Sequence, residues 1–130
     1  MLRKRISLVA LCLGLAVVQG CRQQNASKPN LTVSYEVSPL PARVGDVNIT
    51  IRMTDGSNKP IAGARIKLEG TMSHPGMSSV FVEAKEFGPG NYQTRMKLSM
   101  AGDWIILVHL TLPDGRELDQ QFEIKQVEPA

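Results

Sequence analysis

Cysteine is almost absent from this sequence, and its positions limit what the protein can be. The chain of 130 residues has only two cysteines, Cys12 and Cys21. No thiol therefore occurs after position 21. The region that follows has no residue for a disulfide bond, a cysteine-ligated zinc site or a thiol nucleophile.

Long hydrophobic runs are also missing, apart from one near the N-terminus. A basic segment at residues 3–5 precedes an apolar stretch over residues 6–18. The stretch is short for a transmembrane helix, and this order of segments is typical of a secretory signal. We therefore predict a lipoprotein signal peptide over residues 1–20, because of the motif that ends it.

That motif resembles the bacterial lipobox, in which an aliphatic residue lies three positions before a cysteine and a small residue lies directly before it. Val18 and Gly20 fit this pattern before Cys21, whereas Gln19 stands where a small residue is usual. The resemblance implies a lipidated Cys21 with several acyl chains, which anchor stably where a single chain is marginal. Arg22 replaces the aspartate that retains lipoproteins in the inner membrane. We expect a lipid-anchored protein on the periplasmic side of the bacterial cell envelope, at the outer membrane if the cell is Gram-negative.

The sequence also lacks an excess of either charge. The full chain has 15 lysines and arginines and 12 aspartates and glutamates, but three of the basic residues lie in the predicted signal peptide. The remaining chain has 12 residues of each sign. This balance gives no support for a nucleic-acid partner.

Recognisable catalytic motifs are absent. Ser73, Ser78 and Ser79 lie near a histidine, but no Gly-x-Ser-x-Gly sequence and no acid placed to orient the histidine accompanies them. The segment Gly88-Pro89-Gly90 is too short for a phosphate-binding loop and precedes no helix. No small-molecule substrate is evident, and we expect a protein that is not an enzyme.

The pattern after residue 30 is that of β-strands. Residues 21–30 are polar and unpatterned, which indicates a lipidated cysteine followed by a flexible tether. Beyond them, apolar and polar residues alternate in segments separated by turn-forming residues. The predicted strands are 31–37, 47–53, 64–68, 80–84, 92–98, 104–112 and 118–125.

These strands predict the fold. Seven short strands and no convincing helix favour an all-β protein, a single immunoglobulin-like antiparallel β-sandwich over residues 31–126, followed by a tail over 127–130. The segment 104–112 is apolar at nearly every position, which predicts a central strand covered on both faces.

The most distinctive motif is Met72-Ser73-His74-Pro75-Gly76-Met77. Thioether and imidazole suit copper, and methionine has no proton to lose, so it holds Cu(I) where thiolates would oxidise. In an extended segment Met72 and His74 fall on one face, and a turn at Pro75-Gly76 would bring Met77 toward them. These three residues are the first candidates for a metal site. The alternative is a loop that packs on the domain or faces a partner.

Two further methionines are candidates to complete the site. Met96 and Met100 are four residues apart, which places them on one face of a strand. Met96 also shares the phase of Tyr92, which predicts a place in the core, and Met100 precedes a turn and would equally cap the sandwich. In the apolar segment, His109 is interpreted as a core or cross-strand histidine and Trp104 as a core residue.

Four short motifs follow one another in a defined order. They are Lys59-Pro60-Ile61-Ala62-Gly63-Ala64, residues 72–77, Gly90-Asn91-Tyr92, and Met100-Ala101-Gly102-Asp103-Trp104. In this order they resemble the YtkA-like and FixH-like extracytoplasmic domains, and the resemblance covers residues 31–126. It implies copper as cofactor and a role in copper handling, oxidase assembly or metal efflux. The lipobox stands in place of the membrane anchor of the FixH type.

Two functions are therefore expected from the sequence. The first is a lipid-anchored domain that binds or passes copper through its methionine and histidine loop. The second is a metal-free interaction module of the cell envelope that docks a membrane or periplasmic partner.

Overall fold

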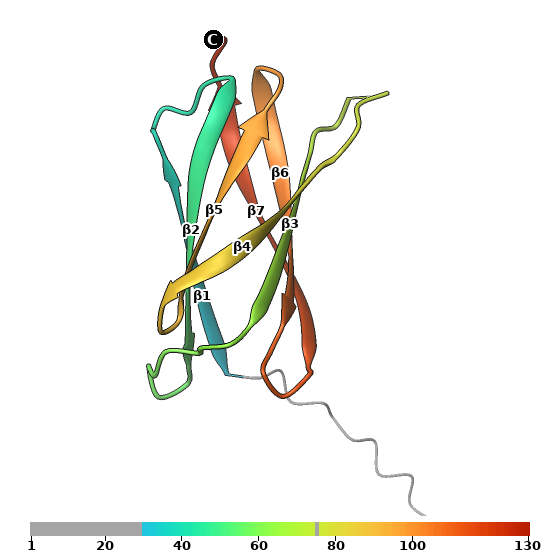
Figure 1. Ribbon diagram of the computed structural model, residues 1–130. Coiled ribbons are helices and arrows are strands. Elements are labelled where there is room, and N and C mark those ends of the chain that lie inside the picture. The colour runs from blue at the N-terminus through green and yellow to red at the C-terminus, as the bar shows by residue number, and fades with distance from the viewer. Residues whose placement is uncertain (1–29, 75) are drawn as a thin grey trace, which may run out of the picture.

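The computed structural model describes residues 30–74 and 76–130, so the predicted signal peptide, Cys21 and nearly all of the predicted tether lie outside the described residues. This part of the chain forms seven β-strands (Figure 1). They are β1 (Leu31–Ser38), β2 (Gly45–Asp55), β3 (Arg65–Thr71), β4 (Val80–Gly88), β5 (Asn91–Leu98), β6 (Gly102–Thr111) and β7 (Glu117–Val127). No helix long and apolar enough to cross a membrane occurs in the described part.

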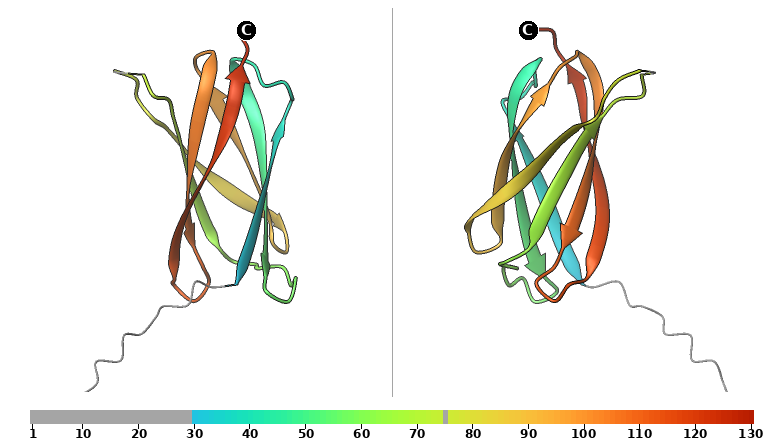
Figure 2. Two further views of the ribbon diagram at one scale, coloured as in Figure 1. Left: turned by 180° about the vertical axis from the view of Figure 1, so that it is seen from behind. Right: turned by 45° about the vertical axis from the view of Figure 1, so that its right-hand side comes forward.

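The strands hydrogen-bond in the order β1-β2-β5-β4-β3-β6-β7, and all neighbours are antiparallel. The sheet is continuous because β4 has two partners: residues 80–84 pair with β3, and the rest of the strand pairs with β5. The sheet folds at β4 into two layers, with β1, β2 and β5 in one and β3, β6 and β7 in the other (Figure 2). Lettered in chain order, the strands have the ABED and CFG arrangement of the immunoglobulin fold. The predicted all-β, immunoglobulin-like sandwich is confirmed.

The core lies between the layers and is built by alternation along each strand. The inward residues of β6 are Trp104, Ile106, Val108 and Leu110, and all four are buried. Successive side chains of a strand point to opposite faces, so Ile105 and Leu107 face outward and are only half-buried. The prediction of a strand covered on both faces is therefore wrong, because a two-layer sandwich has no third layer over the outer face of β6.

The first and last strands contact each other and close the open side of the sandwich. The Tyr35 ring on β1 stacks on Phe122 of β7 with 4.5 Å between ring centroids. The Tyr35 hydroxyl donates a hydrogen bond to Gln120 at 2.7 Å, and burial raises the pKa of Tyr35 to about 12. All core residues lie in the seven strands and their connecting loops. A chain that begins at Arg22 therefore retains the complete fold.

The two ends of the sandwich carry different parts of the chain. Leu31, at the start of β1, lies opposite Asp55 at the end of β2, so the chain enters the domain at this end. Thr71, at the end of β3, lies opposite Ile105 near the start of β6. The β3–β4 loop, the β5–β6 turn and the C-terminus are therefore at the other end (Figure 1).

Candidate metal site

The methionine and histidine motif is the loop between β3 and β4, which extends beyond the sandwich (Figure 1). Gly76 has a φ of 81°, a left-handed conformation that glycine adopts without a Cβ penalty, and Pro75 lies outside the described residues. Because β3 ends at Thr71, its alternation does not continue into the loop. Met72 is only 6% exposed, whereas His74 is exposed. The prediction that these two residues share one face is therefore wrong.

The two thioethers of the loop pack against the domain. The methyl group of Met72 lies 3.0 Å from the point where a Cβ on Gly102 would stand, so Met72 fills the space above the start of β6. Met77 is half-buried and packs against the same core. The loop thus presents an exposed imidazole between two thioethers at the rim of the core.

Met100 lies in the β5–β6 turn, at the same end of the domain. Its side chain is 46% exposed, and its carbonyl accepts a hydrogen bond from the indole N–H of Trp104 at 2.9 Å. Since β5 ends at Leu98, Met100 does not continue the face of that strand, contrary to the spacing argument. It joins the motif through the fold instead, because Met72 contacts Gly102 two residues further along.

Met96 lies inside the core. It is fully buried on β5, and its sulfur is 2.7 Å from the point where a Cβ on Gly70 would stand. The Trp104 ring borders the same space at 3.5 Å, which brings a thioether beside an aromatic ring, a favourable pairing. This placement supports a packing role for Met96 and separates it from the four residues at the exposed end.

The kinds of side chain at this end restrict which metal would fit. Across residues 30–74 and 76–130, no three histidine, cysteine, aspartate or glutamate side chains are arranged to hold a metal ion. A site here would have to use thioether sulfur beside His74. That donor set suits a soft ion such as Cu(I), and it is unlike the carboxylate and carbonyl sets that hold Ca²⁺ or Mg²⁺.

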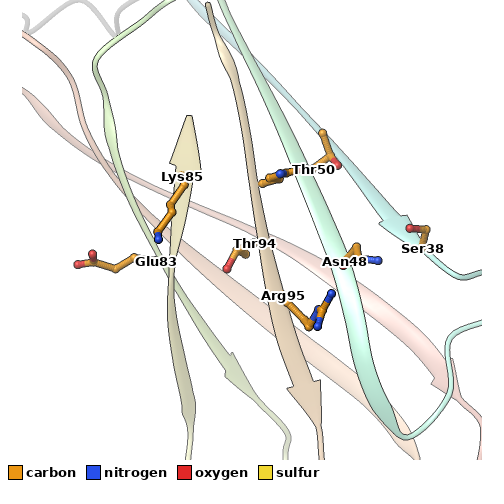
Figure 3. Close-up of a pocket in the computed structure, with 8 residues that line it drawn as sticks. Ser38, Asn48, Thr50, Glu83, Lys85, Thr94 and Arg95 are labelled. Carbon is orange, nitrogen blue, oxygen red and sulfur yellow. The ribbon is translucent and has the colours of Figure 1, made fainter. Parts of the chain in front are cut away.

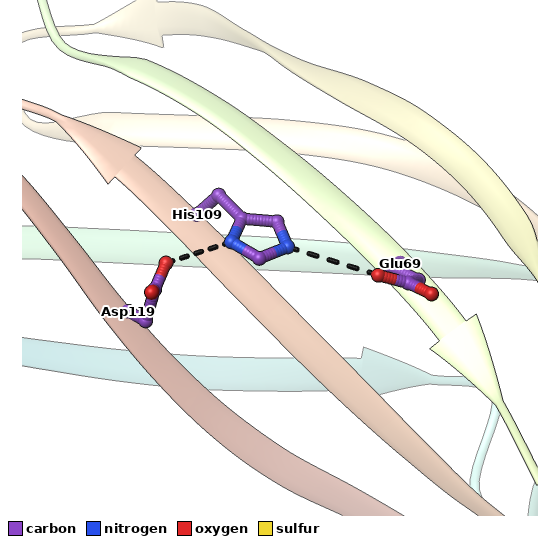
Figure 4. A network of polar contacts seen from close by, with 3 residues as sticks. All are labelled: Glu69, His109 and Asp119. Carbon is purple, nitrogen blue, oxygen red and sulfur yellow. Dashed lines mark hydrogen bonds and ion pairs between the residues drawn. The ribbon is translucent and has the colours of Figure 1, made fainter.

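His109 forms a separate polar network on the outer face of β6 (Figure 4). Its Nδ1–H donates to Oδ1 of Asp119 on β7 at 2.7 Å, and its Nε2 lies 3.8 Å from Oε2 of Glu69 on β3. The cross-strand interpretation is confirmed. The sequence gave no sign of the two carboxylates, because strand register alone brings three distant segments together. The hydrogen bond to Asp119 is the largest of the effects that raise the pKa of His109.

We expect the charged form of His109 to stabilise the fold at low pH. A folded-state pKa above the ordinary value of about 6.5 gives stability that is complete below that value and is lost as the pH rises through the folded pKa. Because the side chain is exposed, the gain should stay below about 1 kcal/mol. In an NMR titration, Asp119→Asn should lower the pKa of His109 more than Glu69→Gln does. Equal shifts in the two variants would contradict this account.

The family model that matches the chain is described as YtkA-like, over residues 26–109. No significant match was found among curated proteins. Three solved structures share the general fold. A putative glycoside hydrolase from Bacteroides vulgatus is 19% identical, with a TM-score of 0.44, over 68% of this chain but 16% of the hydrolase. The PmoD soluble domain from Methylocystis sp. is 14% identical (TM-score 0.47), over 73% of this chain and 89% of that one.

A superoxide reductase (neelaredoxin) from Ignicoccus hospitalis is 12% identical, with a TM-score of 0.49, over 76% of this chain and 80% of that one. These likenesses are too distant to carry a functional argument. The family match is different, because it spans more than half of the chain and includes strands β1 to β5 and most of β6. The chain belongs to the YtkA-like family.

Proposed function

We propose that this protein is a lipid-anchored extracytoplasmic domain that binds or passes copper through Met72, His74 and Met77, with Met100 assisting. The observation that carries the proposal is that the fold gathers these four residues at one end of the sandwich. Membership of the YtkA-like family supports it, since the resemblance implies a role in copper handling or as an accessory to metal efflux. A binding role also agrees with the lack of catalytic motifs, and we propose no enzymatic activity.

The position of this end supports a role in transfer. The chain enters the domain beside the β2–β3 loop, whereas the four residues lie at the opposite end. An anchor at Cys21 would therefore leave the copper-binding end pointing away from its own attachment. His74 is exposed there, and Met100 is 46% exposed, so both would be accessible to a donor or acceptor of the metal.

Competition for Cu(I) tests the proposal. We expect residues 22–130 to withdraw Cu(I) from a chromogenic chelator, and the triple variant Met72→Leu, His74→Ala, Met77→Leu to bind at least about tenfold more weakly. Leucine keeps the volume of methionine and removes only the sulfur, so the packing against Gly102 is retained. His74 is exposed and its loss should not affect folding.

The matched control is Met96→Leu. It removes a thioether of the same size from the core, and we expect its affinity for Cu(I) to equal that of the unmodified protein. Met100→Leu should weaken binding less than the triple variant does. The copper proposal is rejected if the unmodified protein does not compete, if the triple variant competes equally, or if Met96→Leu loses as much affinity as the triple variant.

The lipid anchor has its own test. Cys21 lies outside the described residues, and the proposal depends on the lipobox sequence. In a bacterial host grown with a labelled fatty acid, the unmodified protein should carry label and sediment with membranes. Cys21→Ala should be unlabelled and released, because no thiol remains for acylation. Gln19→Ala, which makes the lipobox regular, should stay labelled. Membrane association of Cys21→Ala equal to that of the unmodified protein would overturn the anchor.

A metal-free interaction module is the second candidate function. Exposed apolar side chains at the same end favour it: Leu40 is 72% exposed and Phe81 is 70% exposed, and Met100 lies near them at this end. Such side chains suit contact with a membrane or periplasmic partner. Failure of the unmodified protein to compete for Cu(I) would favour this function over the first.

A further inference from the structure

Strands β4 and β5 separate along most of their length. They pair only at Lys85–Gln93, Glu86–Tyr92 and Gly88–Asn91. Beyond this stretch, β5 continues to its end paired with β2 alone, while residues 80–84 of β4 pair with β3 alone. Figures 1 and 2 show the two strands diverging as a fork. Within the described chain, residues 94–98 of β5 and residues 80–84 of β4 thus have no strand partner on the sides that face the fork.

An open groove of about 750 Å³ lies at this fork (Figure 3). Glu83 and Lys85 on β4 and Thr94 and Arg95 on β5 are among its lining residues. The side chains of the groove are donors and acceptors of hydrogen bonds, and its sides are strand edges. A strand edge presents backbone N–H and C=O groups in a row, which is a template for another strand.

The floor of the fork is incompletely covered core. Val80, Val82 and Ala84 point inward from β4 and pack against the core, yet all three are only half-buried. On β5, Thr94 is also half-buried, whereas Met96 further along is fully buried. A strand seated in the fork would cover the half-buried residues, and each square ångström of apolar area removed from water contributes about 25 cal/mol.

The charges beside the fork select the kind of strand that fits. Lys85, Arg95 and Lys97 point outward, and none of them forms an ion pair within the described residues. Glu83, the acidic residue of the groove, is paired with Lys67 at 3.9 Å. A second copy of β5 would place cations opposite cations, which destabilises strand pairing. The edge therefore disfavours its own kind and favours a segment that carries carboxylates.

We propose that the fork between β4 and β5 is a docking site for an extended acidic segment of a partner protein, which adds as a strand to the edge of β5. Main-chain hydrogen bonds to residues 94–98 supply affinity, and alternate side chains supply specificity. Carboxylates on the outer face meet Arg95 and Lys97, and apolar side chains on the inner face cover Val82 and Ala84. The five-residue edge suits a strand of ordinary length.

A peptide probe tests this proposal on ¹⁵N-labelled residues 22–130. The probe is an end-blocked peptide of three Glu-Val repeats, and the comparison peptide has lysine in place of each glutamate. We expect the acidic peptide to shift the amide signals of residues 94–98 and 80–84 and to slow their hydrogen exchange. The double variant Arg95→Glu, Lys97→Glu should bind the acidic peptide about tenfold more weakly or less, because it reverses both charges.

Arg52→Glu is the matched control, since Arg52 is an exposed cation on β2 of the same layer and lies outside the groove. It should leave the affinity for the acidic peptide unchanged. The proposal is overturned by an absence of shifts at millimolar peptide, by shifts away from the fork, by equal binding of the basic peptide, or by unchanged binding in the double variant. Self-association through the fork, seen by sedimentation without peptide, would identify a second copy as occupant and would also overturn it.

Discussion

Trp104→Ala is expected to lower the free energy of unfolding by about 3–5 kcal/mol. Trp104 is fully buried at the start of β6, and its ring lies over Gly70 beside the sulfur of Met96. Removing it opens a cavity that this small core cannot fill by relaxation, and a domain of this size has only about 5–15 kcal/mol of stability in total. Urea unfolding of residues 22–130, followed by circular dichroism, measures the loss.

The indole N–H gives this position a second role. It donates to the carbonyl of Met100 at 2.9 Å and so holds the β5–β6 turn against the core. Trp104→Phe keeps most of the bulk and removes this hydrogen bond, so it should cost less than the alanine variant. We also expect both variants to weaken Cu(I) binding, since each releases the turn that carries Met100. A loss of stability below about 1 kcal/mol in Trp104→Ala would contradict the cavity argument.

Gly90→Ala is the second substitution for which we expect a large loss, of about 2–5 kcal/mol, from the summed costs of a left-handed backbone and of overpacking. Gly90 has a φ of 75°, and a Cβ there would lie 2.7 Å from the Cβ of Pro60 and 2.8 Å from the carbonyl oxygen of Met53. Neither neighbour can move easily, because the Met53 carbonyl accepts a hydrogen bond from Ile61 and Pro60 belongs to the same loop. Thermal or urea unfolding provides the measurement.

Gly115→Ala separates the two contributions to this loss. Gly115 has a φ of 88°, but no atom lies within 4 Å of the point where its Cβ would stand. It should therefore cost only the backbone strain, about 1–2 kcal/mol. Equal losses at positions 90 and 115 would show that the contact with Pro60 and Met53 is not what requires glycine at position 90.

The four motifs that carry the family resemblance form two contacting pairs in the fold. At the end where the chain enters, Pro60 packs against Gly90, and the Tyr92 hydroxyl donates to Ile61 and accepts from Ala64. At the other end, residues 72–77 meet residues 100–104 through Met72 and Gly102. Much of the family pattern is thus explained by packing and hydrogen bonding, and His74 is the motif residue that those contacts leave exposed.

The sequence alone was sufficient for the strands and for most of the core. Alternation is a local property of extended backbone, so inward positions such as Trp104 and Tyr92 are readable from their neighbours along the chain. The same local rule failed where a strand stops. It placed Met72 and His74 on one face and Met96 and Met100 on another, although β3 ends at Thr71 and β5 ends before Met100.

Only the tertiary structure decided what the methionines do and which surfaces are open. Strand order and register determine that Met100 lies at the end of the loop motif, that Met96 fills the space over Gly70, and that β4 leaves β5 to form the fork. Register also places His109 between carboxylates from two other strands. These relations join residues far apart in the chain, and their free energy comes from packing between layers, which no local period in the sequence encodes.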